Sequence, residues 1–240
     1  MSKSISNLKF KQGVKDGLPI GLGYLSVSVA FGVKASLLQI PIWITVLISM
    51  TNLTSAGQLS GIEIIAGAGT IIEIILTQLV INSRYFLMSL TLTQKIDNNF
   101  NTKSKLLCSA FITDEIYAVA SSRPQKINPK YVYGLALLPY IGWTLGTLIG
   151  ATLGNFMPTF ITSALGIALY AMFIAIVIPP AKKERGILFA VMLSTLISCA
   201  FYYIPYLNQI SVGFATIISA VLTSLVIAFF FPIKEENEID

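Results

Sequence analysis

The sequence contains no histidine, and this absence excludes several common kinds of catalytic centre. Serine–histidine catalysis, HExxH zinc hydrolysis and histidine-ligated haem all need that residue. No Gly-x-x-x-x-Gly-Lys loop occurs either, so the chain lacks the usual loop for nucleotide phosphates. Only one aspartate, Asp114, lies inside an apolar run, whereas an intramembrane aspartyl protease needs two. These absences favour transport over catalysis, and we expect no cofactor and no metal ion.

Charge of either sign is also scarce. Only 11% of the 240 residues are charged, whereas 55% are hydrophobic, and the mean hydropathy is +0.77. These values lie outside the range of ordinary globular domains and predict a polytopic membrane protein. The net charge of +5 comes from lysines and arginines between the apolar runs, so it indicates topology and gives no reason to expect a nucleic-acid partner.

Eight apolar runs follow one another along the chain. They cover residues 18–38, 41–66, 69–93, 106–122, 131–153, 159–180, 187–204 and 210–232. Runs of about 20 apolar residues are typical of membrane-spanning helices, whereas a transmembrane barrel has short alternating strands. The sequence therefore predicts a single all-α transporter domain over residues 1–240. It would have seven or eight transmembrane segments, some of them broken or re-entrant.

The basic residues predict the orientation. They gather before the first run and in two later links: Lys3, Lys9, Lys11, Lys15, Arg123, Lys126, Lys130, Lys182, Lys183 and Arg185. Because positive charge accumulates on the cytoplasmic side, we expect these links and both termini to be cytoplasmic. The links at 154–158 and 205–209 carry no charge, so we expect them outside.

The front half leaves two topologies open. If 41–66 and 106–122 both span, Lys95, Lys103 and Lys105 lie outside, against the charge rule. If both segments re-enter, only the run 69–93 crosses between the first and fifth runs. We favour eight segments, with 41–66 broken.

Similar landmarks in the two halves indicate a weak internal repeat over 17–122 and 131–232. They are Gly17, Pro19, Tyr24, Gly32 and Pro41 in the first half, and Gly134, Pro139, Trp143, Gly150 and Pro158 in the second. Both stretches would start on the cytoplasmic side, so the repeats would be parallel. The alternative is that glycine and proline simply recur in membrane helices.

The run 41–66 is interrupted by small and polar residues from Thr51 to Gln58. An interruption frees backbone carbonyls and amides, which at membrane depth must be met by protein, water or a bound solute. We therefore expect the substrate near this break, where the amides from Ser55 to Gln58 would be available to it.

Three charges lie near the middle of apolar runs, where an unpaired charge costs at least about 2.5 kcal/mol. Asp114 and Glu115 are central in 106–122, and Arg84 is close to the middle of 69–93. We expect Arg84 to pair with one carboxylate. Adjacent helical residues point about 100° apart, so the other carboxylate needs another partner. The cluster is either a structural ion pair or a site for a zwitterion or a proton relay.

Other polar residues in the apolar runs have simpler interpretations. Glu73 is near the end of its run, and we expect it to be solvated. Glu63 lies deeper in the broken segment and is a candidate for an ion pathway. Gln78 and Asn82 stand one turn apart, which favours hydrogen bonding between helices.

Several stretches resemble one family. They are Gly17-Leu18-Pro19, Gly23-Tyr24, Ala30-Phe31-Gly32, Ser49, Gln58, Asn82 to Met88, and Thr113-Asp114-Glu115. In this order they resemble the AzlC-type branched-chain amino acid exporter subunits, over nearly the whole chain. Tyr85, Thr54-Ser55 and the segment Gly166 to Leu169 depart from the family pattern, which leaves the substrate and the coupling ion open.

The resemblance implies a secondary transporter subunit that exports branched-chain amino acids across the bacterial cytoplasmic (inner) membrane with a small AzlD-type membrane subunit. The candidate substrate-binding residues are Ser55, Gln58, Asn82, Arg84, Asp114 and Glu115. The candidate ion-coupling residues are Glu63, Asp114 and Glu115. A proton is one ion that they could carry, because a buried carboxylate with a raised pKa can hold a proton, but the identity of the ion stays open. The alternatives are export of another small amino acid or organic ion, or a scaffold or pore that transports no amino acid.

Overall fold

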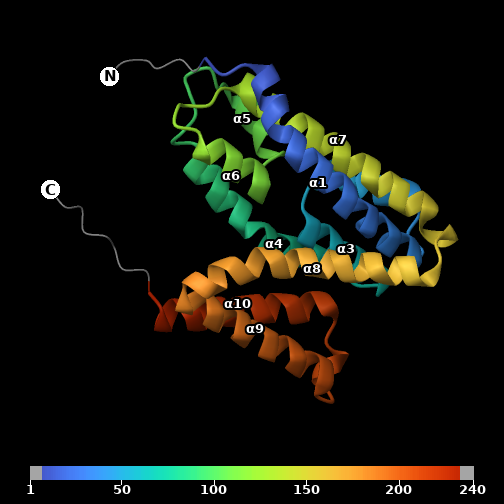
Figure 1. Ribbon diagram of the computed structural model, residues 1–240. Coiled ribbons are helices and arrows are strands. Elements are labelled where there is room, and N and C mark those ends of the chain that lie inside the picture. Colours follow the sequence, from blue (N-terminus) through green and yellow to red (C-terminus); the bar gives the residue numbers. More distant parts are fainter. Residues whose placement is uncertain (1–6, 233–240) are drawn as a thin grey trace. The chain divides into compact units, whose positions relative to one another are not determined.

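The computed structural model describes residues 7–232, except for the side chains of Leu169, Met172 and Ile176, and within that range the fold is helical (Figure 1). The α-helices are α1 (Phe10–Leu37), α2 (Ile42–Thr51), α3 (Ser55–Ala66), α4 (Ile71–Leu92), α5 (Thr102–Ser109), α6 (Asp114–Ser122), α7 (Pro129–Leu153), α8 (Thr159–Lys183), α9 (Arg185–Tyr203) and α10 (Val212–Phe230). Two short 3-10 helices are η1 (Gly154–Phe156) and η2 (Leu207–Gln209).

Six helices of the described chain are long and apolar enough to cross a membrane: α1, α4, α7 with η1, α8, α9 and α10. The predicted all-α membrane protein is confirmed. The other two predicted segments each consist of two short helices, α2 with α3 and α5 with α6. The expected break in 41–66 is therefore present. The run 106–122, for which spanning and re-entry were both left open, is also broken, between Ser109 and Asp114.

The chain forms two compact units. The first comprises Met1–Ile62 and Ile81–Leu169, and the second comprises Glu63–Val80 and Tyr170–Asp240. This division does not follow the proposed repeats 17–122 and 131–232, which stay a prediction.

Within the first unit, α1 and α7 pack so closely that backbone meets backbone. A Cβ atom at Gly13 would overlap the carbonyl oxygen of Tyr131, and one at Gly32 would overlap that of Thr147. Glycines on α7 do the same against α1: Gly134, Gly146 and Gly150. Small residues allow such close approach between membrane helices. The contacts advance in the same direction along both helices, so α1 and α7 run parallel.

The ends of α4 and α6 are fastened to each other. The ammonium group of Lys95, just after α4, donates hydrogen bonds to the carbonyl oxygens of Ser121 and Arg123 at the end of α6. Ile127 donates its backbone N–H to the Lys95 carbonyl at 2.9 Å. The same end holds the starts of α1 and α7, because Asp16 accepts hydrogen bonds from Arg123 and from the Tyr131 hydroxyl.

Arg123 lies outside the candidate spans and is held in its charged form. A hydrogen bond with the Tyr131 hydroxyl is the main reason that the pKa of this guanidinium is raised above its ordinary value. The contact with Asp16 acts in the same direction. The guanidinium is therefore a permanent charge at the shared end of α1, α6 and α7.

These contacts bear on the two open topologies. The segment α5–α6 leaves from the C-terminal end of α4, and the bonds of Lys95 hold the end of α6 at that same place. The segment therefore enters and leaves on the same side of the first unit. Because α1 and α7 are parallel, an odd number of crossings must join them. With α4 supplying one crossing, α2 and α3 must also return to their side of entry. The geometry therefore favours the alternative in which 41–66 and 106–122 both re-enter, and Lys95, Lys103 and Lys105 then obey the charge rule.

Candidate functional site

Both re-entrant segments break at the level of the middle of α1 and α7. At the first break, Tyr140 of α7 donates a hydrogen bond from its hydroxyl to the carbonyl oxygen of Met50 at 3.2 Å. At the second break, Tyr24 of α1 contacts Thr113 and Glu115. Tyr24 and Tyr140 both lie close to the midpoints of their helices. Two helix N-termini, those of α3 and α6, therefore begin at mid-depth, an arrangement typical of solute sites in transporters.

Gln58 closes the first break. Its amide nitrogen donates to the carbonyl oxygens of Ile48 at 3.2 Å and Asn52 at 2.5 Å, and to Ser49 Oγ at 3.3 Å. Its amide oxygen accepts the indole N–H of Trp143 at 2.9 Å. The side chain is 1% exposed. Gln58 thus donates to the carbonyl oxygens that the interruption frees. Both the nitrogen and the oxygen of its amide, which we predicted to bind substrate, already have protein partners.

The second break creates the start of α6. Thr113 is the N-cap residue, and its hydroxyl accepts the backbone N–H of Ile116 at 3.4 Å. Asp114 and Glu115 follow in the first helical turn. Their central place in the run 106–122 predicted the middle of a helix. They lie instead in the first turn of one. The positive end of the helix dipole stabilises carboxylates at this position.

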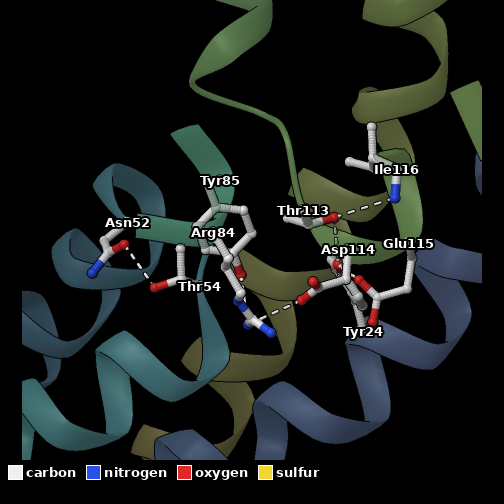
Figure 2. Close-up of polar contacts among 9 residues, drawn as sticks. All are labelled: Tyr24, Asn52, Thr54, Arg84, Tyr85, Thr113, Asp114, Glu115 and Ile116. Carbon is white, nitrogen blue, oxygen red and sulfur yellow. Dashed lines mark hydrogen bonds and ion pairs between the residues drawn. The ribbon is translucent and has the colours of Figure 1, made fainter. Parts of the chain in front are cut away.

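Arg84 of α4 forms the predicted ion pair with Asp114, with 3.0 Å between Nη2 and Oδ2 (Figure 2). Its guanidinium also lies over the Tyr85 ring, 4.9 Å from the ring centre, and donates to the Tyr85 hydroxyl at 3.1 Å. The pair is only partly buried, with side chains 40% and 29% exposed. The Nε atom of Arg84 is buried and has no hydrogen-bond partner among the described residues. A solute could therefore reach only the exposed part of the Arg84 side chain, not its Nε atom.

Glu115 has the separate partner that the 100° spacing predicted. The Tyr24 hydroxyl lies 2.5 Å from Glu115 Oε2 and 2.7 Å from Thr113 Oγ1. The phenol is the donor to both oxygens, so its single proton is shared between the Glu115 carboxylate and the Thr113 hydroxyl. Tyr24 also stacks edge-on against Trp143, with ring centres 5.1 Å apart. This ring contact connects the second break to the residue that holds Gln58 at the first.

The remaining predicted residues fall in different places. Ser55 is the first residue of α3, directly after the first break. Asn82 is half-buried on α4, two residues before Arg84. Glu63 lies in the part of α3 that belongs to the second unit, so it is not one of the residues gathered around the breaks. No group of three residues suited to a metal ion occurs in the described part of the chain.

The expectation for Glu73 is wrong. Its side chain is 2% exposed, because the carboxylate lies against the first turn of α10 in the second unit. The sequence placed Glu73 near the end of an apolar run but gave no sign that another helix begins there.

Comparisons with known proteins place the chain in a family. A model of the AzlC protein family matches residues 19–157, which is more than half of the chain. An inner membrane protein of Escherichia coli K12, YgaZ, is 26% identical over 229 residues, covering 92% of this chain and 91% of the relative. An uncharacterized membrane protein of Archaeoglobus fulgidus is 27% identical over 179 residues, covering 73% and 78%. No solved structure matches. The chain is therefore a membrane-integral protein that belongs to the AzlC family.

Proposed function

We propose that this chain is a secondary transporter subunit that exports small amino acids, of the branched-chain kind, across the cytoplasmic membrane. The observation that carries the proposal is the partly exposed pair of Arg84 and Asp114, placed where two broken segments meet the middle of α1 and α7. An intramembrane charge that remains accessible is a functional-site hypothesis by default.

The pair has the two charges that recognise a zwitterion. The carboxylate of the solute binds the exposed part of the Arg84 guanidinium and the N-terminal amides of α3 beside Ser55. The ammonium group binds Asp114. The aliphatic side chain lies against the buried cluster of Tyr24, Leu53 and Trp143. Binding exchanges the internal ion pair for two pairs with the solute, so charge remains compensated throughout.

A triple variant, Arg84→Ala with Asp114→Asn and Glu115→Gln, tests this assignment. It removes all three charges, so no carboxylate is left unpaired, and we expect normal folded yield with loss of leucine export from loaded cells. Folded yield measured by size-exclusion chromatography is the control. Normal leucine export by the folded triple variant would instead assign these charges to a scaffold or a pore.

We also propose that a small AzlD-type membrane subunit completes the pathway. The family membership supports this, because the resemblance that places the chain in the family implies such a partner. Expression of the chain alone, in a host without any such subunit, should give much less valine export than co-expression. Full export by the chain alone would contradict the need for a partner.

The proposed orientation places both termini in the cytoplasm. With one crossing each by α8, α9 and α10, the C-terminus returns to the side on which α1 starts. In a variant with Cys108 and Cys199 replaced by serine, cysteines at Asn155 or Asn208 should react with an impermeant thiol reagent added outside. Reaction only after the inner face is opened would reverse the orientation.

A further inference from the structure

The second unit contains a buried carboxylate that the proposed substrate site does not use. Glu73 of α4 accepts the backbone N–H of Gly213, the second residue of α10, at 3.0 Å. Two glycines make room for it: a Cβ at Gly213 would lie 2.6 Å from Glu73 Cγ, and one at Gly69 would lie 2.8 Å from Oε2. The carboxylate therefore occupies a fitted space within the unit.

No basic side chain compensates this carboxylate in the described part of the chain. Glu73 takes part in no ion pair there, and α10 carries no charged or titratable residue at all. The link 67–70, which also lies against it, has none either, and the nearest carboxylate along the chain is Glu63 on α3. On α4 itself the next charge is Arg84, about three turns away. In the described residues, the carboxylate accepts one hydrogen bond, from the N–H group of Gly213 at the start of α10.

A second polar group lies on the same face of α4 as Glu73. Thr77 stands one turn after Glu73 on the same buried face of α4 and is 0% exposed. Its hydroxyl has no hydrogen-bond partner among the described residues. A buried hydroxyl without a partner is uncommon, because each one costs about 1–3 kcal/mol. Because Thr77 lies one turn from Glu73 on the same face, its hydroxyl is a candidate partner for the carboxyl group if that group turns toward it.

We propose that Glu73 takes up and releases the proton that drives transport. In the ionised form, Glu73 holds the start of α10 through Gly213. Protonation removes the charge, weakens this bond because neutral acceptors bind less strongly, and leaves a carboxyl group that bonds to Thr77. Proton binding is thereby coupled to release of the α10 N-terminus. This proposal rests on the transport function proposed above, but it concerns a different unit from the substrate site.

Glu73→Gln separates this role from a purely structural one. Glutamine has the same length and still presents an oxygen to the Gly213 N–H, so a structural role predicts a normal protein. The chain, with its membrane partner where one is needed, is reconstituted in vesicles and measured in two modes. We expect Glu73→Gln to retain leucine exchange without a gradient and to lose transport driven by a proton gradient. The matched control is Glu184→Gln, which neutralises an exposed carboxylate before α9 and should retain both modes.

A measurement on the wild-type protein does not depend on the variant folding. A hydrophobic carbodiimide reacts with protonated carboxyl groups inside membranes, and mass spectrometry locates the adduct. We expect an adduct on Glu73 of the wild-type protein when the reaction is run over a range of pH. Absence of the adduct at every pH would overturn the proposal.

The remaining outcomes distinguish the two proposals. If Glu73→Gln transports leucine with a proton gradient as fast as the wild-type protein, the proposed role of Glu73 is wrong, and the proposed transport function stands. If a sodium gradient drives transport by the wild-type protein in place of a proton gradient, and Glu73→Gln loses this transport, then the ligand of Glu73 is sodium and not a proton. If the wild-type protein moves no amino acid in either mode, the proposed function fails, and the carbodiimide adduct alone decides whether Glu73 binds a proton.

Discussion

The first unit contains two kinds of membrane structure: a pair of continuous helices that supports the fold, and interrupted segments that carry the polar residues of the proposed site. The pair α1 and α7 is continuous, parallel and packed through glycines, with backbone against backbone. The segments α2–α3 and α5–α6 are short, interrupted, and end in polar residues at the middle of that pair. Apart from the turns that contain Pro19 and Pro139, the continuous helices satisfy their own backbone groups. The interrupted segments need side-chain partners, and the start of α6 also brings two carboxylates to mid-depth.

The comparison explains why the two breaks need different residues. At the first break, the carbonyl oxygens freed by the interruption need hydrogen-bond donors. The amide of Gln58 supplies them, because it reaches two carbonyl oxygens and a hydroxyl. Thr113 caps the second break and leaves the two carboxylates that follow it free to face other helices. The first break is therefore closed by its own segment. The second is open to Arg84 and Tyr24, which is why we propose it as the substrate site.

Gly21→Ala should have the largest effect, because it attacks the continuous pair. A Cβ at Gly21 would lie 2.8 Å from the backbone of Leu138, and neither backbone can move without displacing its helix. Overpacking of this kind costs about 3 kcal/mol, at the upper end of the usual range. We expect loss of most folded protein, measured by fluorescence-detected size exclusion and thermal unfolding in detergent.

Gly23→Ala is the matched control, two residues further along α1. Nothing lies within 4 Å of a Cβ at this position. Alanine favours a helix over glycine by about 1 kcal/mol, so we expect unchanged or slightly raised stability. Equal losses for both variants would show that α1 tolerates no added methyl group anywhere, and the close packing on α7 would not be the cause.

Gln58→Leu should have the next largest effect, because it reopens the first break. The carbonyl oxygens of Ile48 and Asn52 would lose their side-chain donor, which costs about 2 kcal/mol for groups left unsatisfied. Trp143→Phe removes the bond to the amide oxygen together with part of a buried ring, so we expect it to cost about 1.5 kcal/mol. Thermal unfolding of both purified variants measures the order. A larger loss for Trp143→Phe would show that the tryptophan, and not Gln58, holds the break.

The sequence predicted the features that depend on local composition. The apolar runs, the interruption near Gln58 and the need of Arg84 for an acidic partner all follow from the cost of polar groups in a membrane. The break before Asp114 was missed although its signal was present, since Thr113 followed by two acidic residues is a typical helix start. The apolar character of 106–122 outweighed that signal in the interpretation.

Other features depend on residues that are far apart in the sequence. The burial of Glu73 requires Gly213, which lies 140 positions later, and no local pattern reveals such a contact. The re-entry of both broken segments follows from the parallel contacts of α1 and α7 and from the bonds of Lys95 to the end of α6. Charge counting gave this topology as one of two alternatives, and the tertiary contacts were needed to choose between them.

Tyr24→Phe should have the smallest effect on stability and the most informative one on transport. The phenyl ring keeps the edge-on contact with Trp143, so the packing between the two breaks survives. Only the hydroxyl is lost, which costs about 1 kcal/mol and leaves Glu115 without this donor. If the second break is the active one, leucine export per folded molecule should fall, because the carboxylate is no longer held in place. Tyr140→Phe is the control, since it removes a hydroxyl at the same depth from the first break, bonded to Met50 and not to a carboxylate. If both variants export leucine equally well per folded molecule, the second break has no special function in transport. The two breaks would then differ only in which residues cap them.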